Sequence, residues 1–289
     1  MLDFENNYSQ WREVKLTQRA TQTTLQATPI NDPCSLTNQE LEALRHHCDI
    51  NNFALYRLSH PEAADKLAIR SMAKQVGMLD LDQNLCADND SISSLQVMSM
   101  GRAKGYIPYT TNALNWHTDG YYNPFHLHIR SFLLHCIQKA FAGGENMLIN
   151  HELIYITLYD KDPALITALS QHEALTIPAN IENGVEVRAA QTGPVFYRDE
   201  LTNALQMRYT ARSKSIQWKQ DKILLKAISM IEELLVQSEF VLHYTLRPGE
   251  GLICNNILHG RSAFTNGNIP QQQRLMYRAR SYNRLFSEQ

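Results

Sequence analysis

Short apolar segments separated by turn-forming residues run through most of the chain, and they constrain its fold more than any other feature. HIRSFLLHCIQ, VLHYTL and QRLMYRARSYN are three such segments, and each has the length and composition of a strand. The sequence RPGEG (residues 247–251) predicts a tight turn between two antiparallel strands. Together these features predict a mainly β fold, a sandwich or barrel and in particular a jelly roll, with peripheral α-helices.

A few stretches have helical patterns instead. Thr37 and Glu40 have the spacing of a capping box, which predicts a helix that begins there. A second helix is predicted over residues 61–77 and a third over residues 221–237. The inward-facing residues of the second are predicted to be Leu67, Met72 and Val76. Those of the third are predicted to be Leu224, Ile228, Ile231 and Leu235.

The chain of 289 residues has no internal repeat and no linker-like segment, so we expect a single domain over residues 1–289. Residues 1–100 are predicted to supply N-terminal strands and helices that pack on a catalytic jelly-roll core of residues 100–284. Within the first part, the polar and weakly patterned residues 1–35 are predicted to form strands and loops.

Charge and cysteine content bear on partners and compartment. A formal net charge of −2 gives no argument for a nucleic-acid or membrane partner, so a small-molecule partner is expected. The first residues lack the pattern of a secretory signal. The five cysteines are odd in number and show no C-x-x-C pair, which is typical of reduced thiols. We therefore expect a cytoplasmic protein.

The stretch NWHTDGYYNP (residues 115–124) contains the strongest candidate for chemistry. On a β-strand, His117 and Asp119 would point to the same face and could converge on one metal ion. A histidine hydrogen-bonded to an aspartate in a turn explains an isolated match equally simply. A third ligand could come from His259 in NNILHGRSAF, where Gly260 permits an unusual backbone turn. Two histidines and one carboxylate form the facial triad of non-haem Fe(II) oxygenases, which leaves coordination positions open.

The segment RLMYRAR supplies candidate cations. If it is a strand, Arg274, Arg278 and Arg280 share one face, although the pattern does not show which face looks inward. An inward guanidinium would bind a carboxylate ligand bidentately. The alternative is a solvated edge strand whose charges prevent edge-to-edge pairing.

These motifs together resemble the taurine dioxygenase family of Fe(II)/2-oxoglutarate oxygenases, and the chain is also similar to γ-butyrobetaine hydroxylase. The resemblance rests on WHTD (116–119), AGGENM (142–147), NNILHGRSAF (255–264) and RLMYR (274–278). It implies a double-stranded β-helix and a dioxygenase that consumes 2-oxoglutarate and dioxygen and releases succinate and carbon dioxide. Because Asp119 is present, it implies hydroxylation, or hydroxylation followed by bond cleavage, instead of halogenation.

Residue roles follow from the resemblance. His117, Asp119 and His259 would hold Fe(II). Arg278 would pair with the distal carboxylate of 2-oxoglutarate, and Arg274 would help to position this co-substrate. The family often has threonine or serine where this chain has Asn146, whose amide can still donate a hydrogen bond to a carboxylate.

The expected substrate is a small polar or zwitterionic metabolite. Residues predicted to bind it are Tyr106, Tyr109, Asn112, Tyr121 and Arg208. Clustered tyrosines, Tyr122 included, could cage a quaternary ammonium group or could simply pack at the rim of the barrel.

Two other functions stay open. One is a non-catalytic, cupin-like metal- or ligand-binding protein, and the other is an oxygenase that acts on a protein side chain. Homo-oligomers are common in the family that the chain resembles, but no interface is readable from the sequence.

Overall fold

The computed structural model describes residues 7–21, 26–83, 90–98, 105–212 and 216–287. Its largest sheet has six strands in the order β1-β2-β16-β5-β19-β3, and all neighbours are antiparallel except β1 and β2. The strands are β1 (Thr28–Ile30), β2 (Phe53–Leu58), β16 (Glu250–Cys254), β5 (Ser131–Gln138), β19 (Leu275–Ser281) and β3 (Ser93–Leu95).

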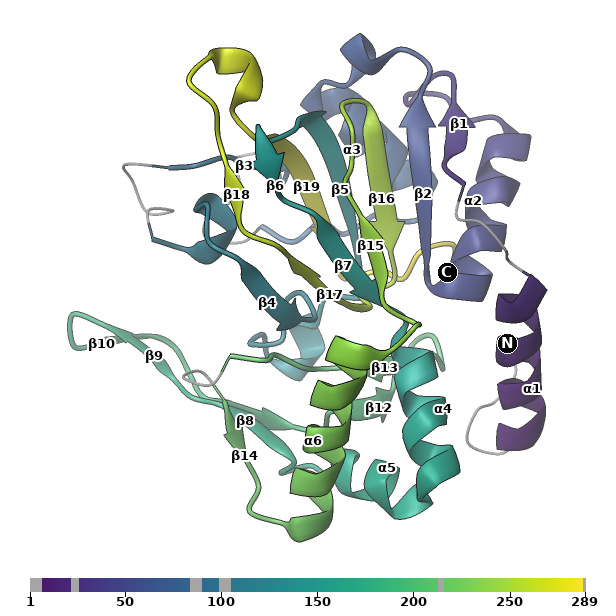
Figure 1. Cartoon of the computed structure of the whole chain (residues 1–289), viewed down its shortest axis with the longest axis vertical. Helices are drawn as coiled ribbons and strands as arrows, with labels where there is room; N and C mark the ends of the chain where they lie inside the picture. The colour runs from purple at the N-terminus through teal and green to yellow at the C-terminus, as the bar shows by residue number, and fades with distance from the viewer. Residues whose placement is uncertain (1–6, 22–25, 84–89, 99–104, 213–215, 288–289) are drawn as a thin grey trace.

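A four-stranded antiparallel sheet lies against the first one (Figure 1). Its order is β15 (Leu242–Tyr244), β7 (Asn146–Ile149), β17 (Leu258–Arg261) and β4 (Leu114–His117). One buried cluster contains Leu134 and Leu252 from the large sheet and Leu148 from the small one, so the core lies between the sheets. A short pair, β6 (Ala142–Gly143) and β18 (Phe264–Thr265), extends the barrel. The predicted mainly β jelly roll with peripheral helices is confirmed.

Helices α2 (Asn38–Asn51) and α3 (Lys66–Gln75) cover the outer face of the six-stranded sheet. The predicted capping box at Thr37 and Glu40 is confirmed, since each side chain accepts a hydrogen bond from the backbone N–H of the other residue. Before α3, Pro61–Ala63 forms a separate 3-10 turn, η1, and Asp65 caps the helix itself. The prediction of one helix over 61–77 with Leu67 inward is therefore wrong. This later start leaves Leu67 72% exposed, while Met72 and Val76 are buried as predicted.

The segment between β7 and β15 forms a further layer below the two sheets (Figure 1), and a second buried cluster packs mostly within it. It is built around α4 (His151–Lys161), α5 (Pro163–Leu169) and α6 (Lys222–Gln237). The predicted inward face of α6 is confirmed, because Leu224, Ile228, Ile231 and Leu235 are all buried. The small strands of this layer are β8 (Leu175–Ile177), β11 (Gln191–Gly193), β14 (Gln217–Trp218), β12 (Phe196–Arg198) and β13 (Leu205–Met207). A hairpin of β9 (Asn180–Glu182) and β10 (Val185–Arg188) projects from it.

The prediction of strands and loops for the first residues is wrong over Tyr8–Thr21, which form helix α1. Its Trp11 is buried edge-on against Tyr155 of α4, and Lys15 forms a 2.8 Å ion pair with Glu152. This tertiary packing stabilises a helix whose own sequence is polar.

Four cysteines lie among the described residues, and all are free thiols: Cys34, Cys48, Cys136 and Cys254. The fifth, Cys86, lies outside the described residues. Within the described part of the chain, the helices are too short or too polar to cross a lipid bilayer.

Candidate metal centre

Four side chains form a row across the small sheet. His259 on β17 is directly opposite Leu148 on β7 and His117 on β4, and His117 also forms a bridge with Thr210. Directly opposite residues in antiparallel strands point to the same face. Because Leu148 packs between the two sheets, the row Leu148–His259–His117–Thr210 faces the barrel interior. The two imidazole rings lie with centroids 4.3 Å apart.

The imidazoles are oriented by their own backbone. Nδ1 of His117 lies 2.8 Å from the carbonyl oxygen of Asn115, and Nδ1 of His259 lies 2.9 Å from that of Ile257. Each Nδ1 therefore donates, which leaves both Nε2 atoms as free acceptors. One ligand atom from each of His117, Asp119 and His259 lies within 4.8 Å of the other two. The structure thus brings together the three residues that the sequence predicted as ligands.

The electrostatics suit metal binding. Burial by itself raises the pKa of the Asp119 carboxyl, but Arg278, whose Nη1 lies 3.5 Å from Oδ1, and His117 hold that pKa well below its usual range. Removal of the His259 ring from water, together with the neighbouring imidazole of His117, lowers the pKa of His259 to about 3. At neutral pH the carboxylate is therefore ionised and the His259 imidazole is neutral, as metal ligands must be.

The site also contains an unsatisfied acceptor. Asp119 is 5% exposed, and its Oδ2 has no hydrogen-bond partner among the described residues. A buried carboxylate oxygen without a partner is costly, and a bound cation would remove that cost. One nitrogen of each imidazole and one carboxylate oxygen of Asp119 lie close together, so the residues fit a divalent metal held on one face.

The structure shows which side chains of β19 point into the barrel. Met276 packs between the two sheets, whereas Ala279 packs under the outer helices. Arg274 and Arg280, in the same alternation as Met276, are 5% and 3% exposed. Since β19 lies between β5 and β3, the alternative of a solvated edge strand is wrong.

The inward arginines occupy different places. Arg278 lies beside Asp119, as its 3.5 Å contact shows. Arg274 lies against Phe264, with its guanidinium carbon 5.2 Å from the ring centroid. Burial and the neighbouring Arg261 lower the pKa of Arg274 to about 9. Asn146 is paired across the sheet with Arg261, so Asn146 and Arg274 both neighbour Arg261.

The predicted substrate contacts are dispersed. Tyr121 is buried, and its ring meets His117 edge-on at 6.4 Å. Tyr109 packs in the core between the sheets, and Tyr106 is 42% exposed, with its hydroxyl donating to Glu182. Asn112 is exposed, and its carbonyl oxygen accepts from Arg261. Among these contacts of the four residues, that of the Tyr121 ring is the one made with a candidate metal ligand, His117.

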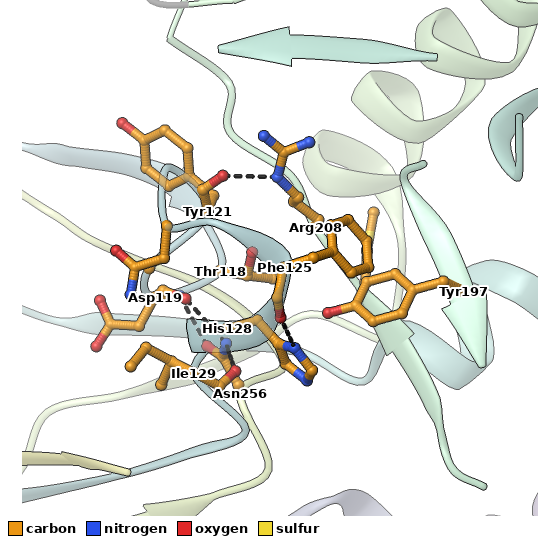
Figure 2. A pocket seen from close by; sticks show the side chains of 12 residues that line it. Thr118, Asp119, Tyr121, Phe125, His128, Ile129, Tyr197, Arg208 and Asn256 are labelled. Atoms are coloured by element: carbon orange, nitrogen blue, oxygen red, sulfur yellow. Dashed lines mark hydrogen bonds between the residues drawn. The ribbon is translucent and has the colours of Figure 1, made fainter. Parts of the chain in front are cut away.

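Arg208 is buried, and its guanidinium donates to three backbone carbonyl oxygens. These belong to Tyr121 at 2.7 Å, Gln191 at 2.9 Å and Leu175 at 3.4 Å. It lines a pocket next to Asp119 together with Phe125, His128 and Tyr197 (Figure 2). In this arrangement Arg208 fixes the segment that carries Tyr121.

Two residues of the site were not found by sequence reasoning. Thr210 is 1% exposed, and its hydroxyl has no partner among the described residues, although it shares the face of His117. Its pairing with His117 is long-range and leaves no signal in the sequence. Asn256 makes three hydrogen bonds to the backbone of Asp119 and Ile129. Its signal was the asparagine pair that precedes the ligand histidine in NNILHG.

Two curated proteins similar to this chain are both named uridine-5'-phosphate dioxygenase. One, from Amycolatopsis sp, is 30% identical over 176 residues, which are 59% of this chain and 61% of that protein. The other, from Streptomyces sp, is 27% identical over 202 residues, which are 68% of this chain and 71% of that protein. The chain thus spans less than two-thirds of the first of these relatives.

Solved structures give the same fold. The crystal structure of the non-heme iron oxygenase OrfP in complex with Fe and alpha-ketoglutaric acid has a TM-score of 0.60 at 13% sequence identity, covering 85% of this chain and 80% of that one. A family model described as taurine catabolism dioxygenase TauD, TfdA family matches residues 16–280. The chain therefore belongs to the TauD/TfdA family.

Proposed function

We propose that this protein is an Fe(II)- and 2-oxoglutarate-dependent dioxygenase that hydroxylates a small polar or zwitterionic metabolite carrying an anionic group. Succinate and carbon dioxide are the other products. The observation that carries the proposal is the convergence of His117, Asp119 and His259, with an unsatisfied carboxylate oxygen, inside a barrel lined by arginines. Bound at these residues, Fe(II) would supply the redox chemistry that couples 2-oxoglutarate to dioxygen.

The two arginines of RLMYR divide the binding of 2-oxoglutarate. Arg278 was predicted to take the distal carboxylate, but its guanidinium lies beside a metal ligand. The five-carbon chain of 2-oxoglutarate carries its distal carboxylate away from the end that chelates the metal. Arg274 is four residues away on the same face, roughly 13 Å along an ideal strand. This distance favours Arg274 for the distal carboxylate, with Arg278 near the chelating end or the substrate.

Arg274 also has the stronger need for an anion. It is 5% exposed and ion-pairs with no carboxylate among the described residues. A buried cation of this kind is destabilising unless an acidic ligand pairs with it. The distal carboxylate would supply that charge and could also accept from Asn146, the second residue predicted to bind the co-substrate.

The charges around the centre favour an anionic substrate. Of four guanidinium groups in this part of the barrel, those of Arg278 and Arg280 act on the Asp119 carboxylate, Arg280 also pairs with Asp82, and those of Arg261 and Arg274 neighbour each other. That is an excess of two positive charges, and Fe(II) would add two more while 2-oxoglutarate would remove two. A substrate with a phosphate, sulfonate or carboxylate group would therefore be attracted to the site.

A quaternary ammonium substrate is less compatible with these side chains. The guanidinium of Arg188 already lies 5.6 Å from the centroid of the Tyr122 ring. The hydroxyl group of Tyr122 accepts a hydrogen bond from Arg280. A second cation at Tyr122 would be repelled, whereas an anion would not. The names of the two curated relatives make nucleoside 5'-monophosphates the first compounds to try.

The deciding experiment is an anaerobic titration of the protein with Fe(II) and 2-oxoglutarate, followed by the visible charge-transfer band of the complex. We expect a band in the wild type, none in His117→Ala, and a much higher 2-oxoglutarate requirement in Arg274→Ala. Uridine 5'-phosphate, a sulfonate and a carboxylate would then be screened by succinate release.

Other results would favour the remaining functions. Metal binding without a 2-oxoglutarate band would favour a non-catalytic, cupin-like protein and contradict the proposal. A band with no small-molecule turnover would shift the search to protein side chains. A larger loss of 2-oxoglutarate affinity in Arg278→Ala than in Arg274→Ala would restore the role first predicted for Arg278.

A further inference from the structure

The turn between β16 and β17 contains a buried asparagine in an unusual backbone conformation. Asn256 is 4% exposed and has a φ of 49°, in the left-handed region that asparagine tolerates better than most residues. Its Oδ1 accepts the backbone N–H of Asp119 at 2.7 Å. Its Nδ2 donates to the carbonyl oxygens of Asp119 at 3.0 Å and Ile129 at 2.6 Å (Figure 2).

The carboxylate of Asp119 has little support of its own. Within the described part of the chain its Oδ2 has no hydrogen-bond partner, and its Oδ1 lies 3.5 Å from Arg278 Nη1 and 3.7 Å from His117 Nε2. Carboxylates that bind metals are usually held by hydrogen bonds from neighbouring groups. Here the direction of the side chain depends on how the backbone of Asp119 is held, and the side chain of Asn256 holds that backbone at both its N–H and its C=O.

The same turn leads directly to the third ligand. His259 follows Asn256 by three residues, and its Nδ1 is fixed by the carbonyl oxygen of Ile257 in between. One side chain therefore ties the segment that carries His117 and Asp119 to the segment that carries His259. We propose that Asn256 is a positioning residue that sets the spacing of the three ligands and thereby the affinity of the centre for its metal.

The chemistry of the amide fits this role closely. Asparagine supplies one acceptor and two donor hydrogens, and the contacts use both kinds. Aspartate would lack the donors, and alanine would leave a buried N–H and two carbonyl oxygens without partners. The inference rests on the proposed metal site, so its test must separate the two.

Asn255 provides a matched control. It is adjacent, of the same type and 3% exposed, but its side chain accepts from the backbone N–H of Leu285 and donates to Asn52. Neither partner is a ligand or a neighbour of one. Asn255→Ala therefore reports the cost of losing a buried amide next to the turn without releasing Asp119.

The experiment measures Mn(II) binding to the metal-free protein from the EPR signal of free Mn(II), alongside thermal unfolding without metal. We expect Asn256→Ala to weaken Mn(II) binding roughly 10- to 100-fold, the range for loss of an outer-shell partner, and Asn255→Ala to change it less than about threefold. Both variants should lower the unfolding temperature by similar amounts. Asn256→Gly removes the same amide, and glycine adopts the positive φ of this position without strain. It replaces the alanine variant in the Mn(II) measurement if that variant fails to fold.

The outcomes are distinguishable. Equal Mn(II) affinity in Asn256 variants and wild type would overturn the role of Asn256, and so would equal losses in Asn256→Ala and Asn255→Ala. A wild-type protein that binds no Mn(II) would instead contradict the metal site itself. A selective loss in the Asn256 variants, with matched stability, would establish the role.

Discussion

Two buried charged clusters lie close together in this protein and differ in how fully they are paired. In one, Asp199 accepts from His128 at 2.7 Å, from Arg130 at 2.6 Å, and from the backbone N–H groups of Leu201 and Thr202. In the other, around Asp119, a carboxylate oxygen, the Nε of Arg278 and the hydroxyl of Thr210 have no partner among the described residues.

This difference in pairing indicates that the Asp199 cluster stabilises the fold and that the Asp119 cluster binds a ligand. Buried polar groups are normally satisfied, and a complete network such as that of Asp199 stabilises one arrangement of the chain. A buried cluster with unpaired acceptors and cations is expected to bind a ligand that pairs with them. We therefore expect substitutions at Asp199 to act on stability and those around Asp119 to act on binding.

The largest effect on binding is expected for Asp119→Asn. It keeps the size of the side chain but removes the charged ligand, so Mn(II) or Fe(II) affinity should fall more than about 100-fold, beyond the usual effect of an outer-shell change. Turnover should fall to background. The denaturation midpoint of the metal-free protein should fall less than in Asp199→Asn, because the contacts of the Asp119 carboxylate with Arg278 and His117 are long, at 3.5 and 3.7 Å. A large loss of stability with metal affinity retained would reverse the contrast.

Asp199→Asn should show the opposite profile. It leaves Arg130 and His128 beside an amide, and breaking a buried pair costs about 3–5 kcal/mol. Urea unfolding of the metal-free protein would measure this cost, with Mn(II) affinity of the folded fraction unchanged. Asp160→Asn is the control, because its pair with Arg12 is 35% and 39% exposed and should contribute less than about 1 kcal/mol. Similar losses in the two variants would contradict the prediction.

The same contrast separates Arg280 on β19 from Arg274, which directly precedes that strand. Arg274→Met removes a buried cation that has no acidic partner among the residues that the structure describes, so stability should be unchanged or higher. The affinity for 2-oxoglutarate should fall roughly 10- to 100-fold, since hydrogen bonds to charged groups contribute about 1.5–3 kcal/mol. Arg280→Met is the control, because it leaves the Asp82 carboxylate, its ion-pair partner, buried without a cation and should destabilise the fold. Calorimetric titration and urea unfolding of both variants would check this, and a stability loss in Arg274→Met would contradict it.

Patterns among neighbouring residues in the sequence were sufficient to predict part of this site. The two-residue spacing of His117 and Asp119 spans the end of β4 and the turn that follows it, and the capping box at Thr37 acts within one helical turn. The third ligand needed the resemblance to the dioxygenase family, because 142 residues separate His117 and His259 in the sequence. That cross-strand pairing is set by the whole barrel and by no local pattern.

The errors have the same physical origin. Leu67 was predicted inward because Pro61 was read as the start of one helix, whereas Asp65 restarts the helix and turns Leu67 to solvent. Helix α1 was missed because its stability comes from the contact of Trp11 with Tyr155, which its own polar sequence does not show. Arginine spacing on β19 gave the shared face but not its direction, which depends on the strands on either side.

The smallest effect is expected for a substitution of Thr210. It tests whether the difference between paired and unpaired buried groups also holds for neutral groups. Its buried hydroxyl faces the metal side of the sheet and has no hydrogen-bond partner in the described ranges. Thr210→Val, which keeps the shape, should therefore leave stability unchanged or raise it by up to about 1 kcal/mol. If the hydroxyl binds the substrate, KM should rise roughly 2- to 10-fold, the equivalent of one neutral hydrogen bond, with 2-oxoglutarate affinity retained. Steady-state succinate release with the substrate found by screening would measure this. A loss of stability without a change in KM would instead show that the hydroxyl stabilises the fold. Buried groups without a hydrogen-bond partner would then indicate a functional site only where those groups are charged.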